Sequence, residues 1–192
     1  DIMMRNETEN DYRVVEEITR EAFWNLYFPG CHEHYLVHKM RNHPDFLKEL
    51  DFVAEYHGKI VGNIMYTKAC LIDERGKEMD IVSFGPLSVL PEYQRKGIGS
   101  ALISHTKDIA MKNGVKAIVI LGDPHNYCKH GFKSAKDVNM SDMLGNYPYG
   151  MLALELEAGA LAGHAWKYKY SDVYEINEKD ADEYDQSFVK KE

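Results

Sequence analysis

The sequence has no long hydrophobic run and few cysteines. No apolar stretch in its 192 residues approaches the roughly 20 residues that a membrane-spanning helix needs. The first dozen residues are too charged to form the core of a signal peptide. Cys31, Cys70 and Cys128 are an odd number and widely spaced, which favours reduced thiols over a disulfide framework. These absences predict a cytoplasmic protein that does not associate with membranes.

Positive charge is also scarce. The chain has 23 lysines and arginines against 31 acidic residues, which gives a formal net charge of −8. An acidic surface repels phosphate backbones, so we expect no nucleic-acid partner. The hydrophobic fraction of 44% is close to the average for globular proteins. A chain of this length can bury a core without a disulfide or a metal ion.

Hydrophobic periodicity predicts a chain of helices and strands. Helical spacing occurs over residues 11–24, 33–41 and 97–113, with a short helix expected at 126–130. Strand patterns occur over residues 52–56, 60–72, 79–89, 116–121, 132–138 and 151–157, with a loop at 141–150. The run at 116–121 follows a helix and is rich in β-branched residues, so it is expected to lie parallel to strand 79–89.

One short motif carries the strongest chemical signal. Residues 94–99, Gln-Arg-Lys-Gly-Ile-Gly, follow a strand and open a helix. Gly97 and Gly99 let the backbone approach a ligand closely, and a helix N-terminus adds about half a positive charge. Arg95 and Lys96 add two full charges. The motif therefore predicts a pyrophosphate cradle, although neither the dinucleotide-binding fingerprint nor the Gly-Lys-Ser/Thr phosphate loop is present.

Two segments resemble a known family. Residues 89–102, from Val-Leu-Pro-Glu-Tyr through the cradle, resemble the acetyl-CoA signature of the GNAT superfamily of N-acetyltransferases. Residues 127–132, Tyr-Cys-Lys-His-Gly-Phe, resemble the superfamily's Tyr-x-x-x-Gly-Phe. The Leu-Gly-Asp-Pro stretch before Tyr127 resembles a bacterial GNAT subgroup of undefined substrate. Two motifs in the right order are far more specific than one.

The resemblance implies a fold and an activity. The fold would be α/β, with a mixed, mostly antiparallel sheet, helices on both faces, and a parallel pair (79–89 with 116–121) splayed at a cofactor cleft. The activity would be transfer of an acetyl group from acetyl-CoA to a primary amine, by direct attack in a ternary complex. The protein would be a monomer or a homodimer. The alternative is a non-catalytic acyl-CoA-binding sensor or interaction module on the same fold.

The resemblance also assigns site residues. Tyr127 would be the catalytic general acid for the departing thiolate, since a phenol with a pKa of about 10 is protonated at neutral pH. The acceptor side would involve Tyr27, Phe28, His32 and Glu33. The residues implied in cofactor binding are Leu87, Ser88, Val89, Gln94, Arg95, Lys96, Gly97, Ile98, Gly99, Ser100 and Asn126. Many family members have an asparagine seven residues before the tyrosine, and here that residue is Ile120.

Several chemical assignments stay open. The base that deprotonates the amine could be Glu55, Asp80, Asp123 or His125. His34 and His38 are four residues apart on a predicted helix, but no further ligands occur at a recognisable spacing, so no metal is expected. A covalent intermediate on Cys128 is the less favoured alternative to direct transfer.

The resemblance covers residues 1–158, and residues 159–192 form an acidic C-terminal extension. From Ser171 onward the extension has eight acidic residues and three lysines. It also contains Tyr174, Ile176, Ala181, Tyr184 and Phe188. A disordered acidic tail is normally poorer in aromatic residues. We therefore expect the extension to dock on its own domain or on a partner subunit.

Overall fold

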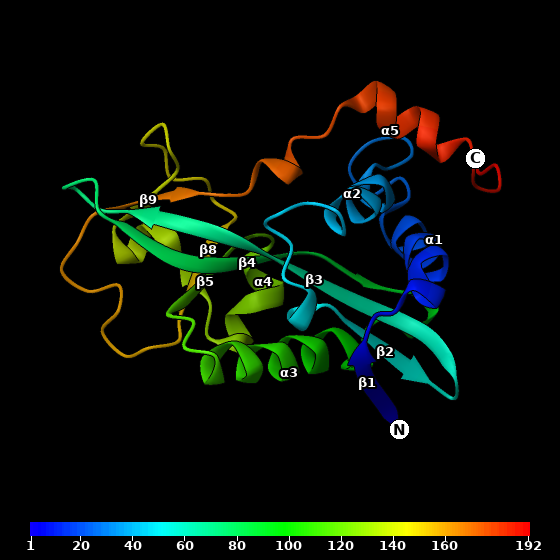
Figure 1. Ribbon diagram of the computed structural model, residues 1–192, viewed down its shortest axis with the longest axis horizontal. Helices are drawn as coiled ribbons and strands as arrows, with labels where there is room; N and C mark the ends of the chain where they lie inside the picture. Colours follow the sequence, from blue (N-terminus) through cyan, green and yellow to red (C-terminus); the bar gives the residue numbers. More distant parts are fainter. The chain divides into compact units, whose positions relative to one another are not determined.

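The structure is a computed structural model that describes all residues from 1 to 192 (Figure 1). The strands form a nine-stranded sheet with the order β1-β2-β3-β4-β5-β8-β6, and β9 pairs with both β3 and β7. The strands are β1 (Ile2–Asn6), β2 (Phe52–Tyr56), β3 (Lys59–Ile72), β4 (Glu78–Val89), β5 (Ala117–Leu121), β6 (Lys133–Ser134), β7 (Met140–Ser141), β8 (Met151–Glu155) and β9 (Trp166–Lys169). The α-helices are α1 (Tyr12–Phe23), α2 (Glu33–Met40), α3 (Ile98–Lys112), α4 (Pro124–Tyr127) and α5 (Glu178–Asp185). No helix has the length and apolar character needed to span a bilayer. The predicted α/β class is confirmed, including the parallel pairing of β4 with β5.

The chain divides into two compact units, each assembled from separate segments. Unit 1 comprises Asp1–Met65, Pro86–Ile103 and Asp172–Glu192. Unit 2 comprises Tyr66–Gly85 and Ser104–Ser171. Strands β3 and β4 and helix α3 contribute residues to both. The expected division between residues 1–158 and an extension from 159 stays a prediction.

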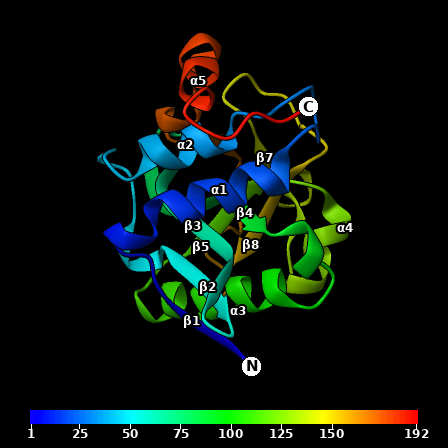
Figure 2. The ribbon, with the colours of Figure 1, turned by 90° about the vertical axis from the view of Figure 1, so that its right-hand side faces the viewer.

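In unit 1, strands β1, β2 and the first half of β3 pair antiparallel. His57 and Gly58, which connect β2 to β3, have φ values of 50° and 78°. Two left-handed residues in a row match the twist of a two-residue hairpin, which joins the two strands predicted at 52–56 and 60–72. Helices α1 and α2 lie on one side of these strands and α3 on the other (Figure 2). The buried core of this unit combines helix residues and strand residues, including Val15, Val37 and Met40 from α1 and α2 and Val53, Val61 and Ile64 from β2 and β3.

In unit 2, β5 lies between β4 and β8, parallel to the first and antiparallel to the second. Its first four residues are buried on both faces, as expected for a strand between covered neighbours. The pairing with β4 comprises Val82 and Ile118. Three residues beyond Val82, Gly85 has a φ of 150°, so the strand is distorted at this residue. The buried cluster of this unit includes Leu71, Ile81, Val119, Met140, Met151 and Trp166.

The structure departs from the sequence analysis at one predicted strand and adds one strand that was not predicted. Residues 132–138 were expected to form one strand, but β6 spans only Lys133–Ser134 and a 3₁₀ helix follows at Ala135–Val138. That helix ends at Asn139, whose φ of 56° turns the chain into β7. Strand β9 was not predicted, although its residues alternate between buried and exposed. Asp11 directly precedes α1, and its carboxylate accepts hydrogen bonds from Arg5 and Thr8 without capping the helix.

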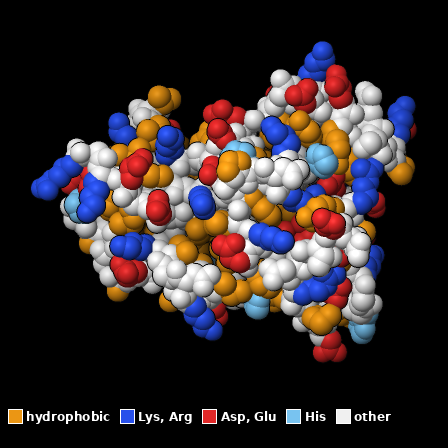
Figure 3. Space-filling model, viewed as in Figure 1, with side chains coloured by type: hydrophobic (Ala, Val, Ile, Leu, Met, Phe, Trp, Pro, Cys, Tyr) orange, Lys and Arg blue, Asp and Glu red, His pale blue; other side chains and the backbone are white.

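The surface charges are mixed. On the face drawn in Figure 3, acidic and basic side chains are interspersed and no large single-sign region stands out. The net charge of −8 is therefore not gathered into one patch on this face.

Candidate functional site

The loop between β4 and α3 carries the predicted cradle. Arg95 and Gly97 both have left-handed backbones, with φ values of 62° and 85°. Left-handed geometry is uncommon for a residue with a side chain, so this loop has an unusual and well-defined shape. The Gln94 side-chain amide donates a hydrogen bond to the Val89 carbonyl at 2.9 Å, which holds the loop to the end of the strand.

The cradle is open and positively charged. A Cβ added at Gly97 would meet no atom within 4 Å, so its surface is free for a ligand to approach. Arg95 and Lys96 are exposed, and the lysine and arginine ion pairs of the structure involve other residues. The ammonium groups of Lys59 and Lys96 lie 5.5 and 5.4 Å from the centre of the Tyr93 ring. Uncompensated cations at a helix N-terminus suit a ligand that carries phosphate.

A side-chain hydrogen bond to α1 holds the strand end Leu87–Val89 in place. The buried Ser88 hydroxyl donates to Thr19 Oγ1 at 3.2 Å. The Thr19 hydroxyl in turn donates to the Val15 carbonyl at 2.7 Å. The Ser88 side chain is therefore used in packing, and the strand end can offer a ligand the backbone of this residue but not its hydroxyl.

Tyr127 lies at the end of α4 in unit 2. Asp123 caps this short helix by accepting a hydrogen bond from the His125 N–H at 3.0 Å. The Tyr127 ring is surrounded by aromatic side chains, with ring centroids at 5.8 Å for Phe84 and 6.0 Å for Phe132. Residues 127–132, which resemble the Tyr-x-x-x-Gly-Phe motif, therefore fold so that the first residue, Tyr127, packs against the last, Phe132.

The candidate bases either have other hydrogen-bond partners or are exposed to solvent. Glu55 accepts hydrogen bonds from Arg5 at 2.9 and 3.2 Å, and Asp123 is the cap of α4. Asp80 and His125 are exposed, as is Asn126.

The connection between α1 and α2 presents aromatic side chains to solvent. Tyr27 is 75% exposed and Phe28 is 40% exposed. Phe28 packs against the His32 ring at a centroid distance of 4.8 Å, and His32 Nε2 lies 3.1 Å from the Asp182 carboxylate of α5. Burial raises the pKa of the neighbouring Glu33 carboxyl. The four residues assigned to the acceptor side therefore lie in one region of unit 1.

The histidine pair considered as a metal site is divided between different partners. His34 Nε2 lies 2.8 Å from Asp185 and its Nδ1 lies 3.5 Å from the Cys31 sulfur. His38 Nδ1 instead lies 3.3 Å from Glu16. Burial raises the pKa of Cys31 to about 12, so this thiol is not a nucleophile despite its histidine neighbour.

Two groups with the geometry of a cation site lie elsewhere, one in each unit. In each group the potential ligand atoms lie within 4.8 Å of one another. The groups are His43, Asp45 and Asp172, and Asp73, Glu74 and His164. In each group the third member is distant in the sequence, with 129 positions between His43 and Asp172 and 90 between Glu74 and His164, so ligand spacing gave no sign of either group.

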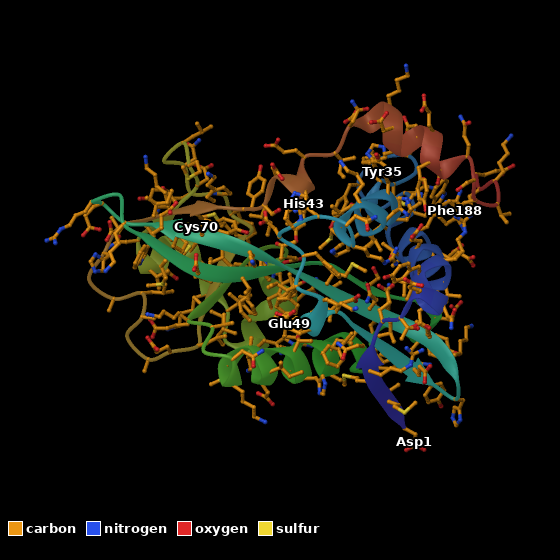
Figure 4. All side chains as sticks on the ribbon, viewed as in Figure 1. Asp1, Tyr35, His43, Glu49, Cys70 and Phe188 are labelled. Atoms are coloured by element: carbon orange, nitrogen blue, oxygen red, sulfur yellow. The ribbon has the colours of Figure 1, made fainter.

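The last segment of the chain makes a polar network with α1 and α2 that the sequence did not predict. Arg20 Nε donates to Asp185 at 2.7 Å, and the Tyr184 hydroxyl donates to Glu16. The guanidinium carbon of Arg13 lies 3.6 Å from the centre of the Phe188 ring. Figure 4 shows the labelled Phe188 beside α1. Helix α5 lies next to α2 in Figure 1. The segment is thus bound to unit 1 by charged and aromatic side chains.

Comparison with known proteins identifies the family. A family model described as an acetyltransferase (GNAT) domain matches residues 49–134. The uncharacterized N-acetyltransferase YhbS of Escherichia coli K12 is 31% identical over 135 residues, which are 70% of this chain and 75% of YhbS. The uncharacterized N-acetyltransferase YjhQ of the same strain is 34% identical over 84 residues, 44% of this chain and 46% of YjhQ.

Solved structures share the fold. The crystal structure of Escherichia coli YhbS in complex with CoA has a TM-score of 0.78 at 23% identity and covers 91% of this chain and 92% of its own. A GNAT family acetyltransferase from Brucella melitensis in complex with acetyl-CoA has a TM-score of 0.71 at 23% identity, with coverage of 91% and 98%. Sequence and fold therefore agree, and this chain belongs to the GNAT acetyltransferase family.

Proposed function

We propose that this protein transfers the acetyl group of acetyl-CoA to a primary amine. The observation that carries the proposal is the open, positively charged loop of residues 94–100 with two left-handed residues before α3. Its backbone N–H groups and cations suit the pyrophosphate of a coenzyme A molecule. The complexes of the two solved relatives with CoA and acetyl-CoA support the same ligand. The three free cysteines fit a cytoplasmic location.

The proposed chemistry is direct transfer in a ternary complex. The amine nitrogen attacks the thioester carbonyl carbon, and a backbone N–H of the strand end Leu87–Val89 stabilises the oxyanion. The C–S bond then breaks, and Tyr127 gives its phenolic proton to the departing thiolate. The nitrogen loses one proton to solvent as the amide forms, and solvent returns one proton to the Tyr127 phenolate, so a neutral amine and the thioester give amide and thiol with no net change in protons. Tyr27, Phe28, His32 and Glu33 border the acceptor, and Asn126 contacts the cofactor.

Ligand binding is tested by thermal stability in the presence of acetyl-CoA. Ligand at 100 times its Kd should add about 2.7 kcal/mol to the free energy of unfolding. Gly97→Val should abolish the shift because the side chain fills the cradle. Gly76→Val is the matched control, since Gly76 has a φ of 83°, against 85° for Gly97, and neither has an atom within 4 Å of an added Cβ. A shift that survives in the Gly97 variant would refute the cradle.

Catalysis is tested by thiol release from acetyl-CoA with a panel of amines. Tyr127→Phe should lower kcat by roughly 10²–10⁴-fold, the usual contribution of a general acid, with little change in the Kd of acetyl-CoA. Tyr66→Phe is the control, because it removes a buried hydroxyl that is bonded to Thr106 and lies outside the site. Wild-type turnover in the Tyr127 variant would make that tyrosine a packing residue. Binding without turnover on every amine would favour the acyl-CoA sensor.

A further inference from the structure

A glycine two residues before α4 packs against the Tyr127 ring, although its backbone conformation does not require a glycine. Gly122 follows β5, and its φ is outside the left-handed range that favours glycine. A Cβ built on Gly122 would lie 2.6 Å from Tyr127 Cε2 and 3.2 Å from Cδ2. The glycine is therefore required for space, because the tyrosine ring lies directly against the backbone at this residue.

The backbone of Gly122 cannot easily retreat from the ring. Its N–H donates to the Gly150 carbonyl at 2.8 Å. A Cβ added at Gly150 would lie 2.8 Å from the Gly122 carbonyl oxygen, so the two glycines pack backbone to backbone. Gly150 directly precedes β8, which pairs with β5. The residue against the ring is thus fixed from behind by the neighbouring strand.

The ring is also confined by two aromatic neighbours. Phe84 and Phe132 lie 5.8 and 6.0 Å from the Tyr127 ring, and 5.9 Å from each other. The tyrosine ring therefore contacts the Gly122 backbone and two rings that are packed together. An added methyl group at Gly122 would move the ring by about 0.8 Å to restore ordinary contact. The hydroxyl is carried on the same rigid ring and would move with it.

We infer that Gly122 is a positioning residue for the Tyr127 hydroxyl, an inference that rests on the proposed function. Because the general acid must lie within hydrogen-bond reach of the leaving sulfur, a displacement of nearly 1 Å is costly. Misplacement on this scale can reduce a rate by about 10²-fold. Gly122 would act through Tyr127, without itself touching a reacting atom.

The test combines Gly122→Ala with Tyr127→Phe. Gly122→Ala alone should lower kcat by about 10²-fold and change the Kd of acetyl-CoA less than twofold. In the Tyr127→Phe background it should produce no further fall, because the hydroxyl that it misplaces is already absent. Falls that multiply in the double variant would overturn the inference. Gly145→Ala is the control for a strained substitution in the same unit, since Gly145 has a φ of 84° but nothing within 4 Å of an added Cβ, so its cost in stability comes without a push on the ring.

A second measurement does not depend on activity. The ¹³C chemical shifts of the Tyr127 ring should change in Gly122→Ala and stay unchanged in Gly145→Ala. Unchanged shifts in the Gly122 variant would overturn the inference even if the enzyme is active. Wild-type turnover of Tyr127→Phe would instead refute the acid role, while shifted ring signals would still support the positioning. If Gly122→Ala does not fold, Phe132→Leu removes another neighbour of the same ring and is expected to give the same non-additivity.

Discussion

Replacing Asp185 with alanine should destabilise the protein through a buried charge left without its partner. Asp185 accepts hydrogen bonds from Arg20 at 2.7 Å and from His34 at 2.8 Å. The Arg20 and His34 side chains are 5% and 0% exposed. Removing one partner of a buried ion pair costs about 3–5 kcal/mol. Asp185 is itself 26% exposed and Arg20 keeps the Val189 carbonyl at 2.8 Å, so we expect the lower end, about 3 kcal/mol.

The assay is urea-induced unfolding followed by circular dichroism. In a thermal melt of the same samples, a loss of about 3 kcal/mol in a chain of this size should lower Tm by roughly 6–12 °C. Asp182→Ala is the matched control on the same helix, because Asp182 is 72% exposed and its contact with His32 is a surface pair. Its loss should stay below about 1 kcal/mol. Equal losses for the two variants would refute the reasoning.

A second substitution and a pH series separate the charge effect from packing. Arg20→Met combined with Asp185→Ala should lose less stability than Asp185→Ala alone, since no buried charge is then left. Burial by itself raises the pKa of Asp185. The hydrogen bonds and charges of Arg20 and then His34 lower the pKa by more than burial raises it, so the net shift is downward. A lowered pKa stabilises the folded state above the unfolded pKa of about 4. The advantage of the wild type over the variant should therefore shrink as the pH falls below that value.

Two further predictions concern carboxyl groups of unit 1. Burial, followed by a hydrogen bond and charge from Glu7, raises the pKa of Asp51 to about 9, so wild-type stability should fall as the pH rises from about 4 toward 9. Asp51→Asn should flatten that fall in urea titrations at pH 5 and pH 9, and parallel slopes would contradict the prediction. The hydrogen bond from Arg5 lowers the pKa of Asp11 to about 2, which stabilises the fold above about pH 4 and is lost as the pH falls to 2. Asp11→Asn should therefore cost about 1–2 kcal/mol at pH 7 and almost nothing at pH 2, as measured by thermal unfolding.

Much of the fold could be predicted because its signals are local. The α3 helix is framed by Gly97 and by Gly114, whose φ of 80° turns the chain away after the helix. The β2–β3 hairpin follows from His57 and Gly58, which accept left-handed backbones. Strand β9 was missed because its alternation is only four residues long and lies in a segment read as an extension. Residues 135–138 were misread because a 3₁₀ helix satisfies its backbone locally and leaves a weak pattern in the sequence.

The part of the candidate site that could be predicted is the part whose residues are close together in the sequence. Arg95 and Gly97 are neighbours in the chain, so their joint role as a cradle could be read from spacing and charge. The contact between Gly122 and the Tyr127 ring depends on a rotamer and on the strand behind it, and no pattern of residue types records either. The pairing of Arg20 with Asp185 joins residues 165 positions apart, beyond the reach of any periodicity argument.

The long separation between Arg20 and Asp185 has a consequence for how the protein is made. A ribosome adds about 5–20 residues per second, so α1 waits roughly 8–33 seconds before its partner aspartate exists. Unit 2 is fully synthesised once Ser171 has been added, whereas unit 1 needs the segment that begins at Asp172. Unit 1, which contains the first residues of this sequence, is therefore completed after unit 2 during synthesis. Its Arg20 and His34 side chains stay hydrated or chaperone-bound until the final helix reaches them.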